Sequence, residues 1–88
     1  MTAIEILSEG TMKAAALHLQ TTGTSLKDID AGKLAECLRE TIKSELDTVM
    51  SEWREATEAN MSEAWLRELM NAQCNELALK ALKAGQFI

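Results

Sequence analysis

One apolar stripe constrains this sequence more than any other feature. Apolar side chains recur at steps of three and four residues through the middle of the chain, the spacing that places them on one face of an α-helix. The 88 residues contain no Pro, so none of the stripe is broken by that residue. The pattern predicts one helix from about Asp30 to Glu58, with an apolar face of Leu34, Ala35, Leu38, Ile42, Leu46, Val49, Trp53 and Ala56.

An earlier segment, from about Thr2 to Gln20, has the composition of a shorter helix. Gly10 lies in its middle and is expected to bend or split it, because Gly is a weak helix former. Gly23 follows and is positioned to end it in a left-handed conformation. No stretch shows the alternation of a β-strand, and aromatic residues make up only 3% of the chain.

A third helix is predicted from about Met61 to Ala84, with Gly85 as its stop. Its apolar stripe consists of Leu66, Leu69, Met70, Gln73, Leu77 and Ala81. This stripe is rotated by roughly a quarter turn from a straight continuation of the preceding one. A turn near residues 57–62 resolves that mismatch, and Asn60 with Glu63 supplies a capping signal. The alternative is one long, bent helix that packs against another chain.

The sequence therefore predicts an all-α fold in one domain spanning residues 1–88. Two long helices would form a hairpin, and a shorter N-terminal helix would pack on it. Because a chain of this length buries a modest core, we expect a second copy to complete the small helical bundle as a homodimer.

Charge excludes several classes of partner. The net charge is −5 and the isoelectric point is about 4.8, which disfavours direct binding to nucleic acid or to an anionic membrane surface. No apolar run approaches the ~18 residues of a membrane span, and no secretion signal is evident at the N-terminus. We therefore expect a cytoplasmic protein with two free thiols.

The residue types that carry chemistry are scattered. With one His, two distant Cys and four dispersed Gly, the sequence predicts no catalytic residue, no metal site and no cofactor. Phosphotransfer helices usually carry a Lys after an exposed His, whereas His18 lies in an apolar stretch and is expected to be buried or half-buried. In a straight hairpin Cys37 and Cys74 would be offset by roughly 13 Å, too far for a disulfide.

The most informative feature for function is where the charge lies. Residues 45–68 hold seven acids and two Arg, so this quarter carries the whole net charge of −5. Both Trp residues lie in it and, in a hairpin, their indoles could meet. Trp is enriched at binding hot spots, and surrounding carboxylates steer basic partners. The candidate partner-binding residues are Glu52, Trp53, Glu55, Glu58, Glu63, Trp65 and Glu68.

Several interpretations of this quarter remain open. In the simplest, Trp53 belongs to the core and the carboxylates only keep the protein soluble. The functional hypothesis is a small, acidic, non-enzymatic protein–protein interaction module, such as a regulator, inhibitor or assembly factor, whose partner has a basic surface. An alternative is a nucleic-acid mimic that blocks a nucleic-acid-binding protein. A third is a helical DNA-binding regulator that uses Lys27, Lys33, Arg39 and Lys43.

Overall fold

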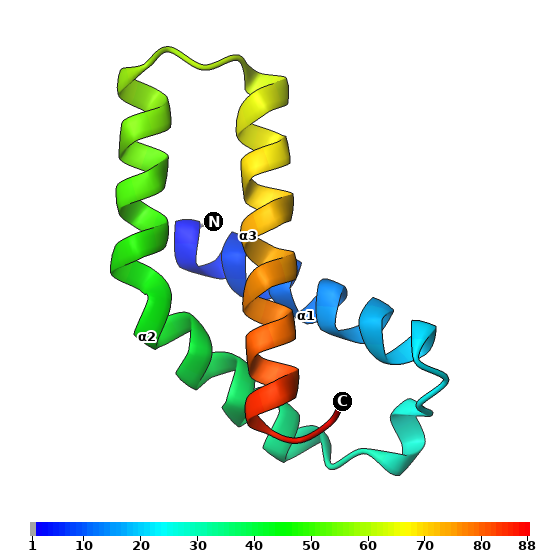
Figure 1. Cartoon of the computed structure of the whole chain (residues 1–88). Helices are drawn as coiled ribbons and strands as arrows, with labels where there is room; N and C mark the ends of the chain where they lie inside the picture. Colours follow the sequence, from blue (N-terminus) through cyan, green and yellow to red (C-terminus); the bar gives the residue numbers. More distant parts are fainter. Residues whose placement is uncertain (1) are drawn as a thin grey trace.

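The computed structural model describes residues 2–88, and three α-helices account for most of them (Figure 1). They are α1 (Ala3–Thr21), α2 (Ala31–Glu58) and α3 (Glu63–Ala84), with a single 3-10 turn, η1 (Leu26–Asp28), between α1 and α2. Within residues 2–88 there is no β-strand. The predicted all-α class is confirmed, including a shorter N-terminal helix packed against two longer ones.

The helices α2 and α3 form the predicted hairpin, and the chain reverses between Glu58 and Glu63 (Figure 1). Asn60 has a φ of 56°, the left-handed conformation that Asn tolerates better than most residues. The Met61 amide then donates to the Ala56 carbonyl at 3.2 Å, which closes the last turn of α2. The reversal is therefore encoded at Asn60, without a Gly or a Pro.

The start of α3 differs from its predicted signal. Asn60 ends α2, whereas the predicted capping signal assigned it to the beginning of α3. The N-cap of α3 is Ser62, whose hydroxyl accepts a hydrogen bond from the Trp65 amide at 3.2 Å. The start of α2 lies where the sequence predicted it, and Asp30 is its N-cap, which accepts from the Lys33 amide at 3.1 Å.

Gly10 does not interrupt α1, which is continuous from Ala3 to Thr21. The prediction that Gly10 splits this segment is therefore wrong. A Cβ atom at Gly10 would lie 2.7 Å from the Cys74 sulfur on α3, closer than atoms pack. Because Gly10 has no side chain, α1 can cross in close contact with α3 at this position.

The C-terminal end of α3 lies where the sequence predicted it, with Gly85 as the C-cap. The left-handed residue at this end is Gln86, with a φ of 59°, whereas Gly23 takes the predicted left-handed conformation after α1. Gly85 is buried beneath Phe87, and a Cβ atom there would lie 2.9 Å from the Cys37 sulfur. The chain folds back at this point, and the Phe87 amide donates to the Leu82 carbonyl at 2.8 Å.

The buried residues fall into two clusters along a molecule of 44 × 23 × 22 Å. In Figure 1, α1 passes behind the hairpin, so all three helices meet in its lower part. There the alanine-rich cluster comprises Ala14, Ala15, Leu19, Leu34, Leu38, Ala78, Ala81 and Leu82. The middle cluster comprises Leu7, Ile42, Val49, Cys74 and Leu77. Beyond it, residues 50–73 form a segment of α2 and α3 that we call the distal hairpin.

Candidate interaction site

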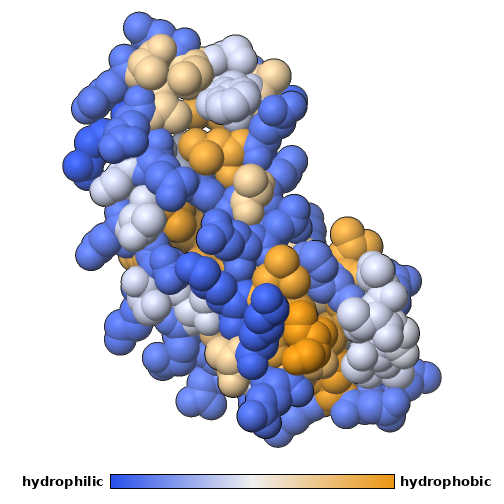
Figure 2. All heavy atoms as spheres, in the orientation of Figure 1, coloured by the Kyte–Doolittle hydropathy of each residue, from blue (hydrophilic) through white to orange (hydrophobic). Residues whose placement is uncertain are grey.

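The distal hairpin gathers the predicted partner-binding residues at one end of the molecule. Glu55 and Glu58 lie on the last turns of α2, and Glu63 and Glu68 lie on the first turns of α3. All four carboxylates are exposed. On the face shown in Figure 2, polar residues cover most of the hairpin, and apolar atoms appear among them near the turn. The excess negative charge therefore surrounds the turn between α2 and α3, as the predicted hairpin implies.

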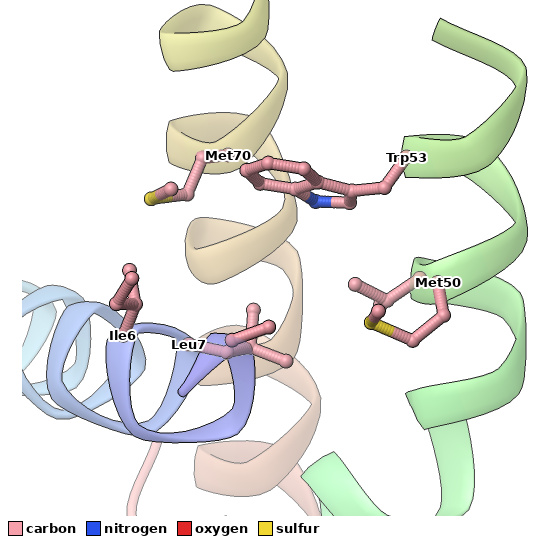
Figure 3. Close-up of a pocket in the computed structure, with 7 residues that line it drawn as sticks. Ile6, Leu7, Met50, Trp53 and Met70 are labelled. Atoms are coloured by element: carbon pink, nitrogen blue, oxygen red, sulfur yellow. The ribbon is translucent and has the colours of Figure 1, made fainter. Parts of the chain in front are cut away.

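Trp53 is directed inward, toward α3, where it packs beside Met70 (Figure 3). Its indole N–H donates a hydrogen bond to the Gln73 side-chain oxygen at 2.6 Å. The Gln73 amide in turn donates to a carboxylate oxygen of Glu52 at 3.1 Å. Two of the predicted binding residues, Glu52 and Trp53, are therefore held by α3, and the half-buried indole contributes to the packing of the hairpin.

Trp65 has the opposite environment. It lies on the first turn of α3 with 51% of its surface exposed, close in sequence to Met61, which is 43% exposed. Gln73, the partner of Trp53, is eight residues beyond Trp65 along the helix, or about 12 Å. The two indoles thus lie at different levels of the hairpin. An exposed aromatic ring and an exposed thioether thus lie at the same end of the molecule.

The carboxylates of the distal hairpin do not form one flat face. Glu52, Glu55 and Glu58 follow one another at steps of three residues, so each is displaced by about 60° around α2 relative to the last. Glu63 is paired with Arg67 through a contact of 2.9 Å on α3. The negative charge therefore surrounds the tip on several sides, with Trp65 and Met61 among it.

An apolar groove opens on the side of the hairpin where α1 lies. It has a volume of about 80 Å³ and is lined by Ala3, Ile6, Leu7, Val49, Met50, Trp53 and Met70. Figure 3 shows Ile6 and Leu7 on α1 below the side chains of Trp53 on α2 and Met70 on α3, with Met50 on α2 facing Leu7. Sequence reasoning missed this groove. Met50 lies just beside the predicted stripe of α2, and its position was the one available signal that the apolar face is wider there.

A polar groove lies between α2 and α3 and includes Glu45, Glu52, Glu76 and Lys80. Lys80 donates to Glu45 at 3.0 Å and lies 3.9 Å from Glu76. The hydrogen bond with Glu45 and the negative charges nearby raise the pKa of Lys80 above its ordinary value. The pair with Glu45 connects α3 to α2, whereas Glu76 lies on α3 itself. Both carboxylates neutralise the charge of Lys80.

The groups considered for chemistry are dispersed in the structure. Within residues 2–88 no three His, Cys, Asp or Glu side chains gather as metal ligands would. His18 is half-buried on α1, and its Nε2 atom is enclosed, so the ring is not presented as a phosphoryl acceptor would be. Cys37 and Cys74 are both free. Burial raises the pKa of the Cys74 thiol, and the neighbouring Thr11 hydroxyl partly opposes that rise.

Comparison with known proteins adds no functional assignment. No protein-family model, curated protein or solved structure matches this chain. Nor does any helix within residues 2–88 combine the length and apolar character that crossing a membrane requires. Function must therefore be argued from the surfaces described above.

Proposed function

We propose that this protein is a non-enzymatic protein–protein interaction module that binds a basic partner through the tip of its α2–α3 hairpin. The observation that carries the proposal is the exposure of Trp65 and Met61 among the carboxylates of the turn. The exposed half of the Trp65 indole contributes no burial to the fold. On a binding surface the same indole supplies a large apolar contact.

The carboxylates support the same site in a different way. Glu55, Glu58 and Glu68 are exposed around the tip, and no ion pair engages them among the described residues. Charges at the rim of an interface raise the association rate and select partners of opposite sign. Trp53 and Glu52 are assigned a different part, since their bonds through Gln73 hold the hairpin together beneath the surface.

The structure gives less support to a mimic of a nucleic-acid backbone. A mimic needs carboxylates in a regular row along one face, whereas those of α2 are displaced around the helix and Glu63 is paired with Arg67. The two proposals also predict different salt dependence. Binding through an indole retains a salt-insensitive part, while binding by charge alone is lost steeply as salt rises.

The experiment compares capture of proteins from a lysate of the source organism by four immobilised chains. They are the wild type, Trp65→Ala, the charge reversal Glu55→Lys with Glu58→Lys, and the control Leu17→Ala. Leu17 is 63% exposed on α1, away from the tip, so its truncation removes a comparable apolar contact elsewhere. A partner identified by mass spectrometry is then titrated against each purified chain.

We expect Trp65→Ala to weaken binding about tenfold or more, since hot-spot residues contribute about 2 kcal/mol or more. The charge reversal should slow association, and Leu17→Ala should leave binding unchanged. Equal binding by the wild type and Trp65→Ala would exclude the tip as the site. Complete loss of wild-type binding at high salt would favour the nucleic-acid mimic instead.

A further inference from the structure

The residues that follow α3 fold back onto the helices (Figure 1, red). The Phe87 amide donates to the Leu82 carbonyl at 2.8 Å, and Gln86 takes the left-handed conformation, as in a Schellman helix end. Phe87 is half-buried and packs against the alanine-rich cluster, whereas Ile88 is 46% exposed. We call residues 86–88 the strap.

The Phe87 ring meets α2 on the face that carries the Cys37 thiol. A Cβ atom at Gly85 would lie 2.7 Å from a carbon of the Phe87 ring and 2.9 Å from the Cys37 sulfur, so ring and sulfur adjoin the same point of α3. Lys33, one turn before Cys37, places its Nζ atom 5.5 Å from the centre of the ring, within the range of a cation–π contact. The strap therefore connects the end of α3 to the part of α2 around Cys37, which is free and half-buried.

The strap is held less firmly than the helices beneath it. Of its three side chains, that of Phe87 alone is partly buried. Gln86 has a φ of 59°, a conformation that a residue with a Cβ atom disfavours. Lys33 is exposed, and cation–π contacts at exposed sites are the weaker ones. A segment with so few buried contacts can open while the rest of the fold stays intact.

We propose that the strap is a gate over the Cys37 thiol, which opens while the three helices remain packed and thereby exposes the thiol to reactive molecules. A molecule that held Phe87 away from α2 would then raise the reactivity of Cys37 without unfolding the protein. The gate is independent of the function proposed for the tip, because it lies at the opposite end of the hairpin.

Cys74 gives the contrast within the same chain. It is 5% exposed on α3, and its sulfur lies at the close crossing with Gly10 on α1. No strap covers it, so the helices must separate before a reagent reaches its thiol. The two thiols should therefore report two different openings, a local one at Cys37 and a global one at Cys74.

The test follows the alkylation of both thiols in the full chain by excess iodoacetamide. In this reaction the sulfur–carbon bond forms, iodide leaves, and the thiol proton passes to the buffer. Mass spectrometry of the digested chain gives one rate for each Cys, with and without urea below the unfolding transition. Opening the strap exposes little surface, so urea should hardly change the rate at Cys37. Separating the helices exposes much more, so the rate at Cys74 should rise steeply.

Three variants alter the strap itself. Phe87→Ala removes the ring and should raise the rate at Cys37 about tenfold, because the closed state loses most of its apolar contact. Gln86→Gly relieves the left-handed backbone and should slow that rate about threefold. Ile88→Ala is the matched control, since it truncates an exposed side chain of the same segment and should change neither thiol. The rate at Cys74 should change little in all three.

The outcomes separate a gate from other causes of protection. Equal rates at Cys37 in the wild type and in Phe87→Ala would overturn the proposal. A rise of the same size at both thiols would overturn it too, because the ring would then stabilise the whole fold. Equal, steep dependence on urea at Cys37 and Cys74 would likewise show that one global opening exposes both. A faster reaction at Cys37 in Gln86→Gly would contradict the part assigned to the left-handed backbone.

Discussion

The two ends of the molecule are built from different packing. At the end where all three helices meet, the buried residues are Leu and Ala, and Ala15, Ala78 and Ala81 have no exposed surface. Small side chains let three helices approach closely and exclude water. In the distal hairpin only two helices run side by side, and the larger Trp53 and Met70 fill the space between them while remaining half-buried. Stability is therefore concentrated at one end, and exposed apolar surface at the other.

The strongest test of this difference truncates one Leu at each end of α3. Leu82 is fully buried in the alanine-rich cluster, and Leu82→Ala should lower the free energy of unfolding by about 2–5 kcal/mol. Leu66 is half-buried in the distal hairpin, so Leu66→Ala should cost less than about 1.5 kcal/mol. Urea unfolding followed by circular dichroism gives both values. Equal costs would mean that the two ends are packed alike.

The two Trp residues sharpen the comparison within the distal hairpin. Trp53→Phe removes the indole donor and leaves the buried Gln73 oxygen without its partner, so it should cost about 1–3 kcal/mol. Trp65→Phe changes an exposed ring and should alter the free energy of unfolding by less than about 0.5 kcal/mol. Each variant retains one Trp, whose fluorescence reports the unfolding. A larger cost at Trp65 would show that the indole at the tip, too, is structural.

A substitution at Gly10 tests the close crossing of α1 and α3, which lies between the two ends of the molecule. Replacing Gly by Ala in a helix normally stabilises it by about 1 kcal/mol. Gly10→Ala should instead destabilise the protein by about 1–3 kcal/mol, because the new methyl group would meet the Cys74 sulfur. In a Cys74→Ala background the same substitution should become neutral or stabilising, measured by thermal and urea unfolding. A stabilising Gly10→Ala in the wild-type background would contradict the close approach of α1 to α3.

A smaller destabilisation than at Gly10 is expected at the ends of the helices. Asn60→Ala should cost about 1 kcal/mol, because Ala disfavours the left-handed backbone that turns the hairpin. Asn60→Gly should leave the free energy of unfolding unchanged or slightly raised. Gly23→Ala, at the other end of the molecule, has no neighbour within 4 Å of the new Cβ atom and should show a similar backbone cost. A neutral Asn60→Ala would mean that tertiary contacts alone fix the reversal.

Much of the fold could be predicted from local pattern. The spacing from Leu34 to Ala56 specified α2, Asp30 specified its start, and the phase change near Asn60 specified the hairpin, because each signal depends on residues close in sequence. The prediction that Gly10 splits the first helix failed, because this Gly is required by the Cys74 sulfur on α3, a helix distant in sequence, and no local pattern records that approach.

The candidate site was predicted in part. The position of the carboxylates at the turn followed from the sequence, but the different environments of Trp53 and Trp65 did not. Both lie on helices within a few residues of the turn. The difference arises from Gln73 and Met70, which lie on α3. Gln73 accepts a hydrogen bond from the indole of Trp53 on α2, and Met70 packs beside that indole.

The sequence by itself determined three helices, the point at which the chain reverses and the concentration of negative charge there. Those features arise from the 3.6-residue period, from capping and from composition, which act over a few residues at a time. Only the tertiary structure decided which side chains those helices cover. The crossing of α1 buries one end of the hairpin and stops short of the other, so Met50 borders an open groove and Trp65 remains in contact with water.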